Sequence, residues 1–317
     1  MAGKTFVKDL KAGGAVEGMF LVAQKEVRQK KTGGDYLYMA LRDKTGTVTA
    51  FMWDGYEPIL PKLEVGGYLK VSAMVQKYNN RTQLVVRKAE LVAPASVEAA
   101  EFLPATTLDT AALWGDIERR IGAVKDPFLR KLLQAAFAGP GVKEGFLRAP
   151  AAKMMHHSCV GGLIEHTHSL MKLCDLVAGF YPQLDADLLA AGAILHDWGK
   201  TRELSSEGAF DYTREGRLVG HIVMTAQEIE RIVNGIPDFP AELKGNITHL
   251  IISHHGQYEF GSPKMPKLRE ALVLSHLDSL DSHLKGFDED LADAEEGSAY
   301  SDIMGRYIFE TNVKPKA

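Results

Sequence analysis

The sequence has few cysteines, no long apolar run and no histidine in its first 155 residues. Its 317 residues include two cysteines, Cys159 and Cys174, which are too few for a disulfide framework, so we expect a reducing environment. No apolar run approaches the roughly 18 to 20 residues that a membrane-spanning helix needs, and the N-terminus has no signal-peptide core. These absences indicate a cytoplasmic protein without a membrane partner, and the length allows two domains with separate cores.

The histidines are concentrated in the second half of the chain. There are 11 of them, and the first is His156. His196 and Asp197 end the apolar run 188–195 and are followed by Gly199. Apolar residues alternating with small Ala and Gly predict a tightly packed, buried helix. A charged pair at the buried end of such a helix is costly unless it is compensated, and a divalent metal is a common compensation.

Other histidines and one aspartate follow similar apolar patterns and complete a candidate ligand set. Besides His196 and Asp197, the candidate ligands are His166, His221, His254, His255 and Asp278. Imidazole and carboxylate donors with few thiols suit Mn, Fe, Co, Ni or Zn. We expect Asp197 to bridge two ions, because a carboxylate has two oxygens and this one directly follows a histidine. Lys200 could then present a fixed positive charge to a phosphate, which makes Asp197 and Lys200 the candidate catalytic residues.

Some residues near this set have no clear role from the sequence. His156, His157 and Asp281 could support the ligands from behind, bind substrate or be structural. We retain His157 and Asp281 as candidates that contact the metal ligands and orient them without binding the metal.

The order of these residues resembles the HD-domain metal-dependent phosphohydrolases. More narrowly, the segments that begin at His156, His196, Gly220 and Ser253 resemble the YhaM-type 3′→5′ exoribonucleases, over roughly residues 145–287. The resemblance implies an enzyme that hydrolyses phosphodiester bonds of single-stranded RNA to nucleoside monophosphates. It also implies a divalent cofactor, and we expect two ions, Mn²⁺ foremost, with Co²⁺, Fe²⁺, Ni²⁺ and Mg²⁺ as alternatives. The 3′→5′ polarity rests on the resemblance alone.

The first part of the chain predicts a different fold. Residues 16–92 contain five short runs of β-branched and aromatic residues, separated by Gly, Asp and Asn turn signals. Five such strands, with a longer connection between the third and fourth, resemble an OB-fold barrel. The sequence therefore predicts a multidomain α+β protein, in which a five-stranded OB-fold β-barrel is followed by an all-α HD domain.

The charge distribution favours a nucleic-acid partner for the barrel. Residues 1–92 carry 15 Lys and Arg against 9 Asp and Glu, a balance of +6, which leaves −10 for the remainder. Aromatic side chains beside cations suit stacked bases and phosphates, although a place in the barrel core is the commoner fate of a single aromatic residue. We expect single-stranded RNA or single-stranded DNA as the partner. The candidate contacts are Tyr36, Tyr38, Trp53, Tyr78 and Arg81, of which the last two flank a predicted loop.

Composition suggests four segments. We expect an OB-fold domain over 1–92, a linker over 93–108, and an HD domain over 109–287 whose helices in 109–137 act as a buttress. Residues 288–317 are expected to be an acidic surface segment and a frayed tail.

Two other functions stay open at this stage. One is an HD-family nucleotide phosphohydrolase or cyclic-nucleotide phosphodiesterase with a regulatory OB domain, and the other is a non-catalytic OB-fold adaptor. The barrel favours the exonuclease, because a free nucleotide gives a single-strand platform nothing to hold. The sequence does not decide metal identity or number, RNA over single-stranded DNA, or whether a homo-oligomer forms.

Overall fold

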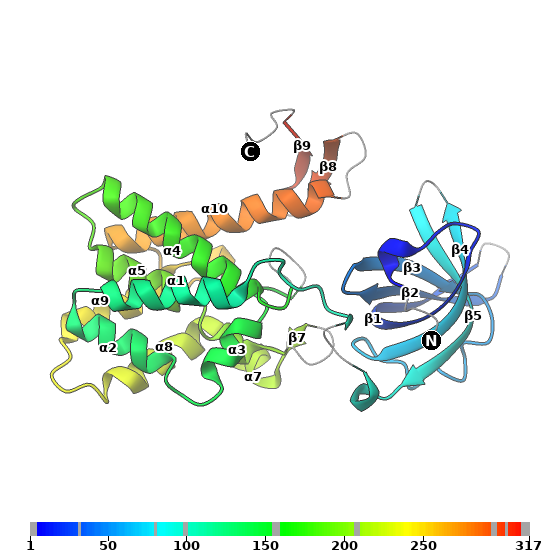
Figure 1. The fold of residues 1–317 in the computed structure, drawn as a ribbon, viewed down its shortest axis with the longest axis horizontal. Helices are drawn as coiled ribbons and strands as arrows, with labels where there is room; N and C mark the ends of the chain where they lie inside the picture. Colours follow the sequence, from blue (N-terminus) through cyan, green and yellow to red (C-terminus); the bar gives the residue numbers. More distant parts are fainter. Residues whose placement is uncertain are drawn as a thin grey trace. The chain divides into compact units, whose positions relative to one another are not determined.

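The chain folds into two compact units. The computed structural model describes residues 5–30, 33–78, 81–97, 101–153, 159–205, 210–292, 297–301 and 304–311 (Figure 1). One unit comprises residues 1–105 and 205–211, and the other comprises residues 106–204 and 212–317.

The first unit is a closed barrel of five strands. Its strands are β1 (Ala15–Gln29), β2 (Asp35–Asp43), β3 (Gly46–Met52), β4 (Tyr68–Tyr78) and β5 (Arg81–Val92), preceded by the short 3-10 helix η1 (Val7–Asp9). The barrel closes in the order β1-β2-β3-β5-β4. The β3–β5 pairing is parallel and the other four are antiparallel. The predicted five-stranded barrel is confirmed.

Side chains of β2 alternate between the barrel core and the outer face, as the period of two along a strand requires. Leu37, Met39 and Leu41 are fully buried, whereas Tyr36 and Tyr38 are half-buried on the other face. The alternation leaves these two aromatic residues of β2 on the outer face of the barrel, where they are accessible to a ligand.

The second unit is helical, with two short additions. Its helices are α1 (Thr110–Ala123), α2 (Pro127–Ala136), α3 (Val142–Arg148), α4 (Gly162–Phe180), α5 (Ala186–Leu195), α6 (Lys200–Glu203), α7 (Arg214–Val219), α8 (His221–Val233), α9 (Ala241–Ser253) and α10 (Arg269–Ala292). The additions are the 3-10 helix η4 (Tyr258–Phe260) and the hairpin β8 (Ser298–Ser301) with β9 (Arg306–Phe309). Two short strands, β6 (Leu204–Ser205) and β7 (Asp211–Tyr212), pair with each other. In the first unit, the 3-10 helix η2 (Pro94–Ser96) follows β5. Asp109 and Asp126 cap α1 and α2, and the side chain of each accepts two backbone N–H groups at the start of its helix.

Helix α5 is the centre of the helical unit. Every residue from Leu188 to Leu195 is buried, and α5 packs against α4, α9 and α10. A Cβ atom at Gly192 would lie 2.5 Å from a methyl carbon of Leu250, so this glycine lets α9 approach α5 closely. The predicted buried helix is confirmed, and it carries His196 and Asp197 into the interior.

The C-terminal part differs from the sequence-based expectation. Residues 288–292, part of the predicted acidic surface segment, form the last turn of α10, where Asp288 and Glu289 are exposed. The β8–β9 hairpin was not predicted. Its alternating aromatic residues were the overlooked signal. The predicted frayed tail from Val313 lies outside the described residues.

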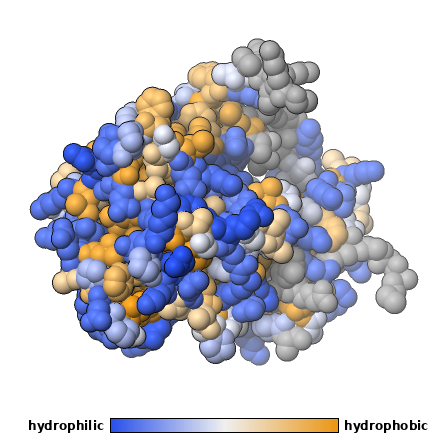
Figure 2. Space-filling view, turned by 60° about the vertical axis from the view of Figure 1, so that its left-hand side comes forward, coloured by the Kyte–Doolittle hydropathy of each residue, from blue (hydrophilic) through white to orange (hydrophobic). Residues whose placement is uncertain are grey.

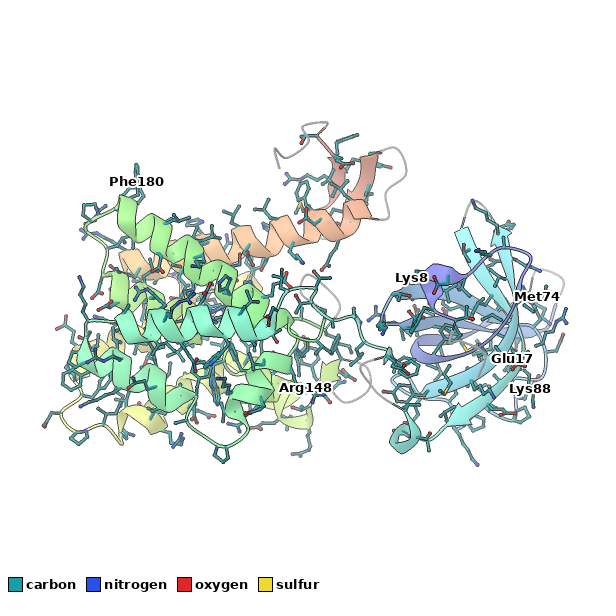
Figure 3. All side chains as sticks on the ribbon, in the orientation of Figure 1. Lys8, Glu17, Met74, Lys88, Arg148 and Phe180 are labelled. Carbon is teal, nitrogen blue, oxygen red and sulfur yellow. The ribbon has the colours of Figure 1, made fainter. Side chains whose placement is uncertain are left out.

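The surface of the molecule mixes polar and apolar side chains. Figure 2 shows hydrophobic residues interspersed with hydrophilic ones on the face that it presents. Phe180, at the end of α4, points away from the helices and is 76% exposed (Figure 3). Among the described residues, no helix is both long and apolar enough to cross a membrane.

Candidate metal centre

A tight turn after α5 positions the central carboxylate of the site. The turn at 196–199 places Asp197 beside the first residue of α8, His221. Gly199 makes this approach feasible, since a Cβ atom there would lie 2.4 Å from the carbonyl oxygen of His221. The backbone N–H of Gly199 also donates to Thr225 Oγ1 at 2.9 Å, which fixes the turn against α8.

The two oxygens of Asp197 face different groups of side chains. Oδ2 lies 3.1 Å from His196 Nε2, 2.7 Å from Lys200 Nζ and 3.8 Å from the Nε2 atom of His166. Oδ1 lies 3.3 Å from His221 Nε2 and 3.6 Å from His254 Nε2. Asp197 therefore joins two clusters of nitrogen donors.

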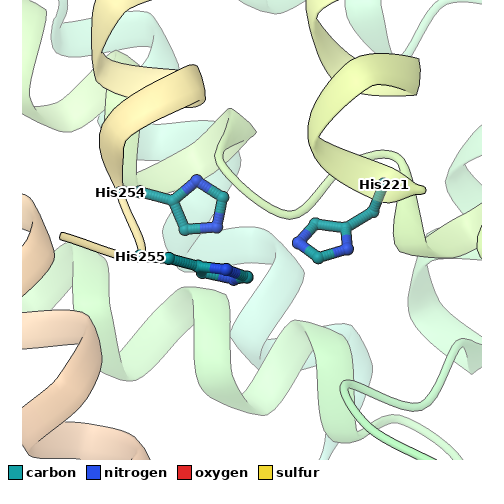
Figure 4. Close-up of side chains that lie close together, drawn as sticks. All are labelled: His221, His254 and His255. Carbon is teal, nitrogen blue, oxygen red and sulfur yellow. The ribbon is translucent and has the colours of Figure 1, made fainter. Parts of the chain in front are cut away.

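Each cluster has the dimensions of a metal site. The potential ligand atoms of His221, His254 and His255 lie within 4.8 Å of one another, and Figure 4 shows the three rings gathered at the adjoining ends of α8 and α9. The potential ligand atoms of His166, His196 and Asp197 also lie within 4.8 Å of one another. Asp278 of α10 joins the second cluster, with Oδ1 at 3.1 Å from His166 Nε2. All seven predicted ligands thus lie together.

The five imidazole rings are held in the same way. Each Nδ1 atom lies 2.6–3.0 Å from an oxygen atom; the partners are Asp281 for His166, the Ala193 carbonyl for His196, Glu203 for His221, the Ile251 carbonyl for His254 and the Phe260 carbonyl for His255. Two of these carbonyls are the otherwise unpaired ones at the C-terminal ends of α5 and α9. A proton on Nδ1 leaves the lone pair on Nε2, which is the arrangement seen in histidine ligands of metals.

Three buried atoms at the centre test whether a metal fits. Asp197 Oδ1, His221 Nε2 and His254 Nε2 are buried and have no hydrogen-bond partner in the described part of the chain. Buried polar atoms without a partner are costly and rare. One carboxylate oxygen and two imidazole lone pairs that converge without a proton between them are suited to a divalent cation. The donor set therefore fits a divalent metal.

The electrostatics of the site also favour a cation. Burial disfavours charge on Asp197, but nearby His196 and Lys200 outweigh it and hold the pKa of this carboxyl well below its usual range. Burial likewise opposes a proton on His166, yet its hydrogen bonds with Asp278 and Asp281 raise the pKa of His166 to about 10. The negative surroundings that stabilise a proton there would also stabilise a metal ion.

Two histidines on the other side of Asp197, His254 and His255, favour the neutral form. Burial lowers the pKa of His254, and burial together with His254 lowers the pKa of His255 to about 4. Neutral imidazole is the form that binds metals. For Lys200, burial is outweighed by Asp197, which raises the pKa of the ammonium group and keeps it charged.

Several supporting residues were not predicted. Glu203, buried at the end of α6, accepts hydrogen bonds from the backbone N–H and from Nδ1 of His221, at 2.9 and 3.0 Å. The Ser169 hydroxyl donates to Asp281, which was predicted to lie behind the ligands and does contact His166. A glutamate in a short polar segment carries no sequence signal of burial. His157 lies outside the described residues.

The metal-ligand cluster opens into a pocket of about 710 Å³. Asp197, Lys200, His254, His255 and Asp278 lie at its polar end. Hydroxyl groups from α10 line another part of the pocket; they belong to Ser275, Ser279 and Ser282. The apolar part of the lining consists of Phe260, Met265 and Leu272. A pocket with charged, hydroxylated and apolar parts can accommodate a phosphate, a sugar and a base.

On the barrel, the predicted aromatic residues form a continuous row. Tyr36 and Trp53 have ring centroids 4.7 Å apart, and Trp53 stacks on Phe51 at 5.7 Å. Tyr38 is 5.8 Å from Phe51, and the guanidinium of Arg28 lies 3.7 Å above the Tyr38 ring. The row therefore combines ring surfaces with a cation.

The other two predicted contacts lie elsewhere on the barrel. Tyr78 ends β4, is 66% exposed and pairs in register with Arg81. Among the described residues, no ring contact joins Tyr78 to the aromatic row. The side chain of Arg81 lies outside what the structure describes. Its contact with single-stranded nucleic acid therefore stays a prediction.

Comparison with known proteins gives the same two-part organisation. Residues 22–92 match the family model of the OB-fold nucleic acid binding domain, and residues 163–283 match that of the HD domain. The 3′-5′ exoribonuclease YhaM of Listeria innocua is 32% identical over 299 residues, which cover 94% of each chain. The YhaM of Bacillus subtilis is 32% identical over 286 residues, or 90% of each chain. The chain therefore belongs to the YhaM family of 3′-5′ exoribonucleases.

Proposed function

We propose that this chain is a metal-dependent exoribonuclease that removes nucleoside monophosphates from the 3′ end of single-stranded RNA. The observation that carries the proposal is the pair of donor clusters that share Asp197 at the end of an open pocket. The 3′-5′ polarity is that of the relatives named above. Residues 1–92 would hold the strand, 93–108 would link the domains, and 109–292 would carry out hydrolysis, since α10 extends to Ala292.

The two clusters would provide ligands for two divalent ions. His166, His196 and Asp278 would hold one ion together with Oδ2 of Asp197. The second ion would be held by Oδ1 of Asp197 together with His221, His254 and His255 (Figure 4). Imidazole and carboxylate donors without thiolate can hold Mn²⁺, Co²⁺, Fe²⁺, Ni²⁺ or Mg²⁺, and we keep Mn²⁺ as the first candidate from the family resemblance. Bound ions of this kind supply Lewis acidity towards a phosphodiester and generate hydroxide near neutral pH.

The protein contributes position and charge. Lys200 lines the pocket, and its ion pair with Asp197 at 2.7 Å fixes the ammonium group where a phosphate would enter. A fixed cation next to a reacting phosphate stabilises the charge that develops in the transition state. The apolar side chains of Phe260 and Met265 would support the terminal base, and their exposed positions suit an unpaired strand end.

The barrel would hold the rest of the strand. The row of Tyr36, Tyr38, Phe51 and Trp53 offers rings to unpaired bases, and Arg28 offers charge to a phosphate. Tyr78 and Arg81 extend this role as predictions. Counterion release from such contacts makes binding weaker as the salt concentration rises.

The exonuclease activity is tested by replacing the shared carboxylate. Wild-type protein with Mn²⁺ should shorten a 5′-labelled RNA stepwise and stop near a stable hairpin. Asp197→Asn should lose at least about 10³-fold in rate while its circular dichroism spectrum is unchanged, because a neutral amide with a single oxygen cannot serve both clusters.

Asp238→Asn, at an exposed loop position, is the matched control and should behave as wild type. Near wild-type hydrolysis by Asp197→Asn would refute the assignment of the site. Efficient turnover of deoxynucleoside triphosphates or cyclic dinucleotides with intact RNA would show a nucleotide phosphohydrolase instead.

The support that Glu203 gives to His221 should appear in metal affinity. Glu203→Ala removes the acceptor of two N–H groups, so Mn²⁺ affinity measured by calorimetry should fall about 10- to 100-fold. Glu203→Gln, which can accept one of them, should lose less. Glu215→Ala, half-exposed beside Arg202, is the control. Unchanged affinity in Glu203→Ala would exclude His221 as a ligand.

The aromatic row should contribute to RNA binding and not to chemistry. Replacing Tyr36 or Trp53 by Ala should weaken binding of a single-stranded RNA by about 1–3 kcal/mol, because each removes one stacking surface. Fluorescence anisotropy in the Asp197→Asn background measures this loss without hydrolysis. Turnover of bis(p-nitrophenyl) phosphate, which has no nucleotide strand for the barrel to hold, should be unaffected. Tyr300→Ala, exposed on β8, serves as control, and equal losses on both substrates would indicate a folding defect.

A further inference from the structure

The helical unit has a second pocket that contains none of the candidate metal ligands. It measures about 520 Å³ and lies between the end of α8, one face of α9 and the segment 264–267. Its polar lining consists of Glu230, Lys244, Thr248, His249, Lys264 and Lys267, and we call it the basic pocket.

The charges of the basic pocket are unbalanced. Three ammonium groups line it against one carboxylate, and that carboxylate, Glu230, is paired with Lys244 at 2.6 Å. In the described part of the chain, neither Lys264 nor Lys267 has an acidic partner. Both side chains are exposed, and an anion in the pocket would meet two ammonium groups that no described carboxylate neutralises.

The histidine of the basic pocket adds a neutral donor. His249 Nε2 accepts the backbone N–H of Lys267 at 2.9 Å, so this nitrogen carries a lone pair and the ring proton lies on Nδ1. Burial and the charge of Lys267 lower the pKa of His249, in keeping with a neutral ring. No protein acceptor for Nδ1 occurs among the described residues. Together with the Thr248 hydroxyl, the pocket offers donors and positive charge.

The donors and the size of the pocket suit a phosphate ester. Phosphate oxygens accept several hydrogen bonds, and lysine binds them as a point charge. A volume of about 520 Å³ exceeds the needs of a simple ion and falls within the range of small-molecule sites. Ile252 and Ala241 supply apolar surface for the organic part of such a ligand.

The basic pocket is connected to the metal centre by one segment of chain. Residues 256–268 follow directly after His255; Phe260 and Met265 line the metal-containing pocket, and Lys264 and Lys267 line the basic pocket. The segment is attached to α9 by the bond from Lys264 N to the Ile252 carbonyl, 3.2 Å, and by the His249 contact. One continuous segment therefore contributes side chains to both pockets.

We propose that the basic pocket is a phosphate-binding site for nucleotides, with Lys264 and Lys267 as its charge partners. The choice of a nucleotide as the phosphate ester rests on the proposed function. The phosphate can come from the RNA strand that enters the metal-containing pocket or from a released mononucleotide, and the two sources are separable by experiment.

The test compares wild type with a K264Q/K267Q variant of the full chain in the presence of chelator, so that no hydrolysis occurs. Isothermal titration with inorganic phosphate and with adenosine 5′-monophosphate measures the free ligands. Anisotropy with a single-stranded RNA 10-mer measures the strand. K125Q/K131Q removes two exposed lysines of the same unit and is the matched control.

At least a 10-fold loss of phosphate and mononucleotide affinity in K264Q/K267Q, with the control unchanged, supports a site for the free nucleotide. A loss of that size for RNA alone supports a site for the strand. If all three ligands bind K264Q/K267Q as they bind the control, or if none binds any of the proteins, the proposal is wrong. Because binding is measured without metal, a chain that binds phosphate here but does not degrade RNA would refute the proposed function and leave the pocket assignment intact.

Discussion

The structure depends on one buried carboxylate, that of Asp197, whose two oxygens face two sets of imidazole nitrogens. Burying such a group costs several kcal/mol unless opposite charge compensates it. Lys200 supplies part of that charge, and the histidines supply lone pairs that suit a cation. The burial of α5, the missing side chain at Gly199 and the start of α8 at His221 all serve to keep this carboxylate in position.

The ligands are rigid because helix ends hold them. His196 and His254 follow the last residues of α5 and α9 and turn back to carbonyl groups that a helix leaves unpaired. His166 and His221 instead use carboxylates from α10 and α6. Each ring is thereby held in one orientation with Nε2 directed towards the site, which lowers the reorganisation that metal binding requires.

The sequence predicted what depends on local pattern and missed what depends on tertiary contact. Apolar periodicity and the His-Asp pair placed Asp197 at the end of a buried helix. For a single aromatic residue the sequence favoured the barrel core, and the outward position of Tyr36 and Tyr38 became clear only from the structure. Glu203 was missed because its burial arises from contact with His221, 18 residues further along the chain. The basic pocket was missed for the same reason, since neither Lys264 nor Lys267 belongs to a motif. The division of the ligands between the two oxygens of Asp197 required coordinates.

The most direct test of this account is anomalous diffraction from crystals of the chain prepared with Mn²⁺. The account predicts two peaks on opposite sides of the Asp197 carboxylate, one near His166 and His196 and the other near His221 and His254. Asp197 should contact both ions. A single ion that leaves one of the two clusters unused, or ions that do not contact Asp197, would contradict it.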